Sequence, residues 1–139
     1  MIARDTSAKS IAVRPDGGGK TMSDGIVAVI DDNEDVLDSL SLVLEMYGFA
    51  VTPYAMSVSF LEDFTARPSC LIVDQNMPGM KGLELVARLR QQGNLIPVLV
   101  TTGLPSSDIA EDAARLGIER VITKPAKVDD LLNFVSKYC

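Results

Sequence analysis

The chain has 139 residues, of which 47% are hydrophobic, and its formal net charge is −6. This length suits one domain with a real core and is too short for two comfortable ones, while the acidic charge argues against a nucleic-acid surface, which needs a basic patch. The sequence contains no histidine, which excludes catalytic triads with histidine, histidine-ligated metals and a phosphohistidine intermediate on this chain.

Residues 1–24 are polar, contain a run of three glycines and are predicted to form a flexible N-terminal leader before a domain of residues 25–139. The stretch "RPDGGGKT" (14–21) invites comparison with a phosphate-binding loop. That motif needs a glycine where Arg14 stands, and the following "TMSDG" does not start a helix. A flexible linker is therefore the preferred interpretation.

From residue 26 onward, short β-branched apolar runs alternate with segments of helical periodicity. The predicted strands are 26–30, 50–54, 70–73, 97–101 and 120–123, and the predicted helices are 33–47, 56–66, 82–92, 105–116 and 127–138. Gly48, Gly93 and Gly117 follow predicted helices, where a left-handed cap residue is favoured, and Pro105 lies near the start of another. Five β–α units predict a doubly wound α/β domain with a five-stranded parallel sheet and helices on both faces.

Polar residues collect where these strands end. They are Asp31 and Asp32 after the first strand, Asp74 after the third, Thr101 and Thr102 at the fourth, and Lys124 after the fifth. The carboxyl ends of parallel strands meet at one edge of the sheet, where ligands bind in such folds. Three carboxylates placed together there would raise one another's proton affinity unless a cation is present, and hard oxygen ligands suit Mg²⁺.

This set of residues is suited to phosphoryl transfer. Asp74 ends an apolar strand and is the expected nucleophile toward a phosphoryl group. Thr102 can donate a hydrogen bond to a phosphoryl oxygen, and Lys124 supplies a point charge for the same oxygens. Positioning and charge neutralisation carry most of the catalysis in such reactions, and neither requires a histidine.

Four motifs in this order resemble a two-component response-regulator receiver domain. They are the acidic pair at 31–32, "VDQNMPGMKG" at 73–82, "VTTG" at 100–103 and "TKP" at 123–125. The resemblance covers about residues 25–139 and implies a single receiver domain of the flavodoxin-like (βα)5 fold. It also implies that Asp74 is phosphorylated by a sensor histidine kinase or a histidine phosphotransfer protein.

The resemblance further implies how Mg²⁺ is held. Asp32 and Asp74 would bind the ion directly, Asp31 would act largely through water, and Asn76 would contribute its backbone carbonyl. Thr102 and Lys124 match the hydroxyl and lysine positions of the family. A cis Lys124–Pro125 bond is implied in the same way, although only about 5 to 6% of X-Pro bonds are cis in general.

One position departs from the family pattern. Three residues before the lysine the family usually has Phe or Tyr, whose rotation follows phosphorylation, whereas this chain has Val121. A valine has little to rotate, so aromatic gating of the output face is in doubt. The alternative is movement of the loop after Thr102 and of the alanine-rich helix near 106–116.

The acidic residues also admit two simpler interpretations. Asp31 and Asp32 could cap the first helix, an explanation that weakens once Asp74 and Lys124 are placed beside them. "DDNED" (31–35) also resembles the start of a calcium loop. Because Val36 and Leu42 occupy the required glycine and glutamate positions, an EF-hand is rejected.

Cys70 and Cys139 do not specify a disulfide framework, so a reducing cytoplasm is expected, and Cys70 is expected to be a small core residue. No run approaches the roughly 18 apolar residues of a membrane span, and a signal peptide is not evident. We therefore expect a soluble cytoplasmic protein that contacts neither membrane nor nucleic acid.

The predicted function is a stand-alone phosphoacceptor switch, whose only chemistry is its own phosphorylation and dephosphorylation. With no output domain expected after residue 139, it would act on a downstream protein or pass the group along a relay. The alternative is an aspartyl-phosphate hydrolase of the haloacid-dehalogenase type. Such an enzyme requires an aspartate at the position of Asn76 and also a cap domain. A fragment of a transcription factor would predict a basic helix-turn-helix beyond residue 139.

Overall fold

The computed structural model describes residues 4–5, 7–8, 25–63 and 65–139. Within the predicted leader it describes only β1 (Arg4–Asp5) and β2 (Ser7–Ala8), two short strands that pair in parallel. The remaining leader residues, including the rejected phosphate-loop stretch, lie outside the described part, so the flexible leader stays a prediction.

One five-stranded parallel sheet forms the centre of the domain, with the order β4-β3-β5-β6-β7. Its strands are β3 (Ile26–Ile30), β4 (Ala50–Tyr54), β5 (Cys70–Asp74), β6 (Val98–Thr102) and β7 (Arg120–Thr123). The predicted doubly wound sheet is confirmed. The third and fourth strands each end one residue later than predicted, so Asp74 and Thr102 are the last residues of their strands.

The strand order places two acidic residues side by side. From β3 the chain runs out to the edge strand β4 and then returns to β5 on the other side of β3, so the order reverses at the β3–β5 pair. Ile30 pairs with Val73 in the register of these two strands. Asp31 and Asp74 are the next residues along and therefore reach the same edge, at the switch point where such sheets bind ligands.

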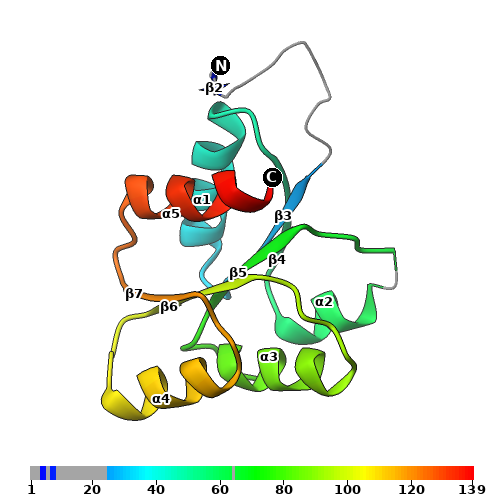
Figure 1. Cartoon of the computed structure of the whole chain (residues 1–139), viewed down its shortest axis with the longest axis vertical. Coiled ribbons are helices and arrows are strands. Elements are labelled where there is room, and N and C mark those ends of the chain that lie inside the picture. Colours follow the sequence, from blue (N-terminus) through cyan, green and yellow to red (C-terminus); the bar gives the residue numbers. More distant parts are fainter. Residues whose placement is uncertain (1–3, 6, 9–24, 64) are drawn as a thin grey trace.

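In the described part of the chain four helices connect the strands of the sheet and a fifth follows the last strand (Figure 1). They are α1 (Glu34–Met46), α2 (Ser57–Glu62), α3 (Gly82–Gln91), α4 (Ser107–Arg115) and α5 (Val128–Tyr138). None of the described helices is long and apolar enough to span a bilayer. Gly48, Gly93 and Gly117 all have positive φ after a helix, which confirms their predicted role as left-handed caps.

Side-chain caps explain where two of the helices begin. The Asn33 side chain accepts hydrogen bonds from the backbone N–H groups of Asp35 and Val36, which starts α1. Ser106 caps α4 in the same way by accepting from the N–H of Ile109. The predicted helix over 105–116 therefore begins two residues late, at Ser107.

The prediction of a helix over 56–66 was too long. α2 ends at Glu62 because the Asp63 side chain accepts a hydrogen bond of 3.1 Å from the backbone N–H of Thr65, which turns the chain. The Tyr54 hydroxyl donates to the same carboxyl at 2.7 Å, and burial together with this bond raises the pKa of Tyr54 to about 12. The turn at Asp63 is thereby attached to the end of β4.

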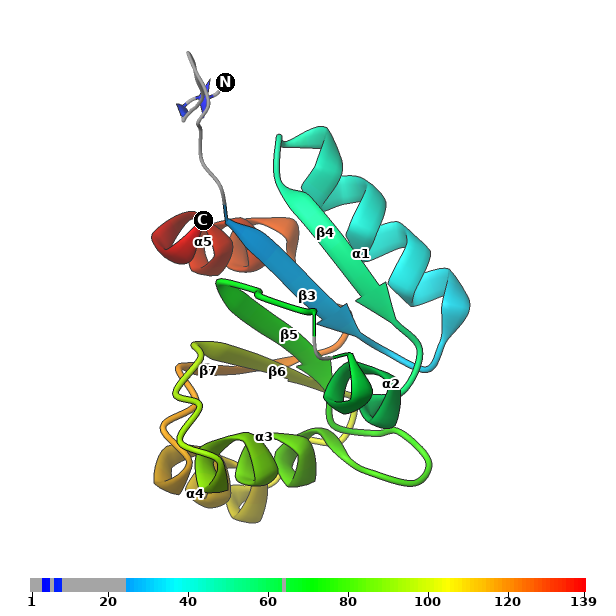
Figure 2. The same ribbon diagram turned by 90° about the vertical axis from the view of Figure 1, so that its right-hand side faces the viewer.

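The helices cover both faces of the sheet, with α1 and α5 on one face and α2, α3 and α4 on the other (Figure 2). Successive side chains of a strand alternate between these faces. Val27 and Val29 therefore join a cluster with Leu44 and Phe134 on the α1–α5 side. Their neighbours in β3 join a second cluster on the other side. Burial on both faces accounts for the continuous apolar strands of the sequence.

Arg90 ties together three segments on the α3–α4 side. Its Nε donates to the backbone oxygen of Leu116 at 2.7 Å, and one Nη donates to those of Asn94 and Ile96 at 3.0 and 2.9 Å. Leu116 is the C-cap residue of α4, and Asn94 and Ile96 precede β6. The end of α4 is therefore fastened to the end of α3.

Candidate functional site

Three carboxyl groups meet at the carboxyl edge of the sheet. One oxygen from each of Asp31, Asp32 and Asp74 lies within 4.8 Å of the others. Asp31 and Asp74 are 1% and 2% exposed, whereas Asp32 is exposed. The ends of β3 and β5 thus bring together the three acidic residues that were predicted to meet at this edge.

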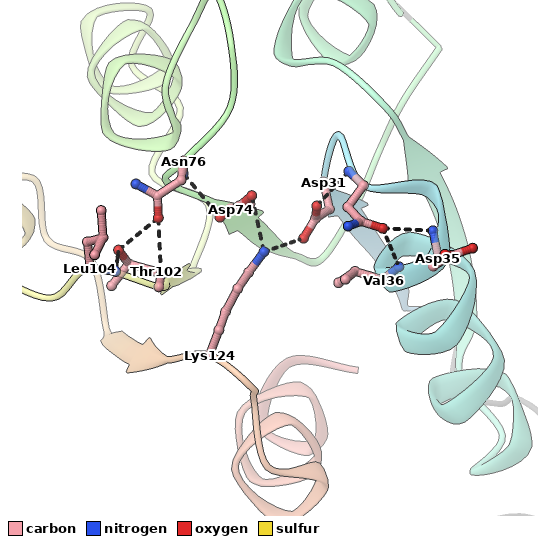
Figure 3. Close-up of polar contacts among 10 residues, drawn as sticks. Asp31, Asp35, Val36, Asp74, Asn76, Thr102, Leu104 and Lys124 are labelled. Atoms are coloured by element: carbon pink, nitrogen blue, oxygen red, sulfur yellow. Dashed lines mark hydrogen bonds and ion pairs between the residues drawn. The ribbon is translucent and has the colours of Figure 1, made fainter.

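Lys124 connects two of these carboxyl groups (Figure 3). Its Nζ lies 3.0 Å from Asp31 Oδ2 and 3.2 Å from Asp74 Oδ2. The backbone N–H of Lys124 donates to the oxygen of Thr102, which holds the start of the loop after β7 beside the end of β6. The Lys124–Pro125 peptide bond is cis, as the family resemblance implies.

The charges in the site are unevenly balanced. Burial raises the pKa of Asp31 and the neighbouring Asp74 raises it further, while hydrogen bonds from the Asn33 N–H and Lys124 oppose the rise. Burial alone would lower the pKa of Lys124, but the hydrogen bonds and charges of Asp31 and Asp74 outweigh it and raise that pKa. Among the described residues, three carboxyl groups thus share the single ammonium of Lys124, an arrangement that favours a further cation.

Asn76 links Asp74 to Thr102 through hydrogen bonds (Figure 3). The backbone N–H of Asn76 donates to Asp74 Oδ1 at 3.1 Å. The Asn76 side-chain oxygen accepts from Thr102 Oγ1 at 3.0 Å and from the Gly103 N–H at 3.1 Å. Thr102 Oγ1 in turn accepts from the Leu104 N–H at 3.1 Å, so the hydroxyl holds the loop after β6.

The family resemblance implied a role only for the backbone carbonyl of Asn76, and nothing in the sequence predicted the hydrogen bonds of its side chain. Thr102, rather than the neighbouring Thr101, makes the side-chain contact in this network, and both threonines are buried. Thr102 is therefore the threonine that contacts Asn76, and its role toward a phosphoryl group stays a prediction.

Gln75 and Gly82 position α3 against the end of β5, and neither was singled out from the sequence. The Gln75 side chain is buried and accepts a hydrogen bond of 2.8 Å from the N–H of Leu83, in the first turn of α3. A Cβ on Gly82 would lie 2.7 Å from the backbone oxygen of Asp74, closer than such atoms approach. Only a glycine lets the helix begin this close to Asp74.

A groove opens beside these residues, between α1 and the loop after β7. Its volume is about 470 Å³, and its walls are mainly apolar. The residues that line it are Asp35, Val36, Ser39, Leu40, Thr101, Lys124, Pro125 and Ala126. The lysine of the site is thus also part of the groove wall.

Comparison with known proteins places this site in a family. A model of the response regulator receiver domain matches residues 27–136. The transcriptional regulatory protein FixJ of Bradyrhizobium diazoefficiens is 34% identical over 112 residues, which cover 80% of this chain and 55% of FixJ. An uncharacterized 14.6 kDa protein from the sodA1 3′ region of Leptolyngbya boryana is 33% identical over 125 residues, covering 86% of this chain and 94% of that protein.

The solved structures agree with this assignment. The crystal structure of FixJ-N matches with a TM-score of 0.76 and 32% identity, over 84% of this chain and 94% of that one. The chain spans about half the length of the FixJ proteins that it matches, 55% in one species and 47% in another. The family match over most of the sequence, together with these relatives, shows that the chain belongs to the response-regulator receiver family, the phosphoacceptor switches of two-component systems.

Proposed function

We propose that Asp74 is the phosphoacceptor and that it receives its phosphoryl group from a sensor histidine kinase or a histidine phosphotransfer protein. The observation that supports this most is the position of Lys124, whose Nζ lies within 3.2 Å of both buried carboxylates. An ammonium placed there can neutralise charge on a group attached to Asp74.

In the proposed reaction an oxygen of Asp74 forms a bond to phosphorus while the bond from phosphorus to the donor's imidazole nitrogen breaks, and that nitrogen keeps the electron pair. Lys124 attracts the phosphoryl oxygens. The Thr102 hydroxyl releases Asn76 and donates to one of these oxygens instead, so the hydrogen bond seen at 3.0 Å is exchanged for one to the new group.

The donor set fits Mg²⁺. Asp31, Asp32 and Asp74 supply hard oxygen atoms, and we propose that the backbone carbonyl of Asn76 completes the protein ligands. Asp32 is exposed, which leaves room for the water molecules that Mg²⁺ retains. When bound there, the ion neutralises charge on the transferred group and orients it.

The groove beside Lys124 suits an apolar helix of the phosphodonor protein. Val36 and Leu40 of α1 form one wall and Pro125 and Ala126 form the other, with Lys124 between the groove and Asp74. A helix seated in the groove would therefore carry its histidine close to the acceptor.

Phosphorylation would be transmitted through the loop after Thr102. Loss of the bond from Thr102 to Asn76 removes one of the hydrogen bonds that hold this loop, whose Gly103 and Leu104 lead into α4. Ala113 is the one buried residue of that helix. Val121 offers no aromatic ring to rotate. We propose that a protein target, or a further relay protein, reads this surface in the cytoplasm, because the net charge of −6 does not favour direct contact with nucleic acid.

The hydrolase alternative finds no support in the site. A haloacid-dehalogenase-type enzyme needs an acidic group two residues after the nucleophile, but Asn76 has an amide, which already binds Thr102 and Gly103. The chemistry that we propose is limited to phosphorylation and dephosphorylation of Asp74 itself.

Intact-mass measurement with acetyl phosphate tests this assignment without requiring the cognate kinase. We expect the wild type to gain one phosphoryl group when Mg²⁺ is present, and Asp74→Asn to gain none. Asp38→Asn is the matched control, because Asp38 is an exposed carboxylate of α1 that is not part of the acidic cluster. Equal labelling of Asp74→Asn and the wild type would show that another residue is the acceptor.

A further inference from the structure

The two cysteines meet at the edge of the sheet opposite the acidic cluster. Cys70 is the first residue of β5 and Asp74 is the last, while Cys139 is the C-cap of α5. Their sulfur atoms lie 3.7 Å apart although the residues are 69 positions apart in the sequence, and both are thiols. Figure 2 shows the end of α5, marked C, beside the start of β3, which pairs with β5.

Packing and hydrogen bonding hold this contact in place. The backbone N–H of Cys139 donates to the oxygen of Val135 at 2.9 Å, so Cys139 is bound to the last turn of α5. A Cβ on Gly25 would lie 2.8 Å from both Cα and Cβ of Cys139, so the glycine is what allows α5 to end there. A disulfide has sulfur atoms about 2.05 Å apart, so the two sulfurs need to approach by only about 1.7 Å.

The two thiols differ in exposure and in acidity. Cys70 is 0% exposed, whereas Cys139 is half-buried. The hydrogen bond to Cys139 and burial raise the pKa of the Cys70 thiol. Hydrogen bonds from Cys70 and from the Ser69 side chain lower the pKa of Cys139. Cys139 is therefore both the more exposed residue of the pair and the one whose thiol forms a thiolate more readily.

We propose that Cys70 and Cys139 form a reversible disulfide by exchange with a low-molecular-weight disulfide such as oxidised glutathione, and that this bond fastens the end of α5 to the start of β5. The Cys139 thiolate attacks one sulfur of the reagent, which gives a mixed disulfide and releases one thiolate. Cys70 gives its proton to that thiolate and attacks Cys139 Sγ, which breaks the mixed disulfide and expels the second thiolate; this thiolate takes from water the proton that Cys139 gave up on ionising. Two protein thiols are oxidised and one external disulfide is reduced to two thiols.

This bond would be a switch rather than a permanent link in a reducing compartment, because ambient thiols reverse the same exchange. It closes a loop of about 70 residues, which restricts the unfolded chain strongly. We therefore expect the oxidised domain to unfold about 10 °C above the reduced one.

The test incubates the full chain with oxidised glutathione, alkylates the remaining thiols and maps disulfides by mass spectrometry before and after reduction. We expect the wild type to lose two hydrogen atoms, to carry no glutathione, and to yield a peptide pair joining Cys70 to Cys139. Two variants test the order of attack: Cys70→Ala should stop at a stable glutathione adduct on Cys139, and Cys139→Ala should remain unmodified because Cys70 is buried.

Three results would overturn the proposal. These are a wild type in which both thiols are still alkylated after oxidation, one that ends with glutathione adducts, and one that forms only dimers linked between chains. If Cys70→Ala does not give the wild-type circular dichroism spectrum, peptide mapping of the wild type together with Cys139→Ala still decides the question.

Discussion

Gly82→Ala tests how closely the start of α3 controls the position of Asp74. The added Cβ would lie 2.7 Å from the backbone oxygen of Asp74 and 3.2 Å from Cα of Gln75, where ordinary contact begins at 3.4 Å. Because both neighbours are backbone atoms, helix and strand must separate by 3.4 − 2.7, or about 0.7 Å. Overpacking of this kind costs about 1 to 3 kcal/mol, and the loss of glycine entropy from the unfolded chain returns about 0.4 to 1 kcal/mol. We expect a net destabilisation of about 1 to 2 kcal/mol.

The same displacement should slow phosphorylation. A shift of about 1 Å in a reacting group can cost a factor of about 100, so a smaller shift of Asp74 relative to Lys124 should slow labelling by acetyl phosphate about tenfold. Urea unfolding measures the stability and intact mass measures the rate. Gly103→Ala is the control for unfolding, since a Cβ there meets nothing within 4 Å. The reasoning fails if Gly82→Ala unfolds within about 0.5 kcal/mol of the wild type and is labelled at the wild-type rate.

Three further predictions concern stability and loop order. Burial raises the pKa of Asp31, so the folded domain loses stability as pH rises from below 3.8 through the raised value and this carboxyl group ionises. Without divalent cations, Asp31→Asn should therefore stabilise the domain more at pH 7 than at pH 4, as measured by urea unfolding. An equal effect at both pH values would contradict this. Leu44→Ala should destabilise by about 2 to 5 kcal/mol because Leu44 is 0% exposed, while Leu42→Ala, at 58% exposed, should change stability by less than about 0.5 kcal/mol; similar losses would show that the two helix faces are not distinguished. Asn76→Ala should speed hydrogen exchange of the Gly103 amide, which has lost its acceptor, and an unchanged rate by NMR would show that the hydrogen bond does not order the loop.

The strands and the main site residues could be predicted from the sequence because the information is local or topological. Runs such as "IVAVI" are buried on both faces and read as parallel strands without knowledge of their neighbours. Once five such strands are parallel, their carboxyl ends must lie at one edge of the sheet. This predicts that Asp31, Asp74 and Lys124 are neighbours, as the structure shows.

What the sequence did not reveal depends on side-chain direction in loops. The apolar spacing over 56–66 continued a helical pattern, but the turn at Asp63 competes with it through a single side-chain hydrogen bond to Thr65. The contact between Asn76 and Thr102 joins residues 26 positions apart, and it exists because two loops happen to face each other. Periodicity carries no signal for such a pair.

The contacts of Arg90 fix one end of α4 and leave the other end less constrained. The C-terminal end of α4 is bound to Arg90 of α3 through the Leu116 carbonyl. Its first turn lies next to the Thr102 loop and has Ser106 as its side-chain cap. A small displacement of the Thr102 loop would therefore rotate α4 about its C-terminal end, which Arg90 holds, and would move the N-terminal end of the helix. The sheet would not need to deform. Substitutions at Arg90 should then change the amplitude of this rotation of α4 without altering the contacts of Thr102.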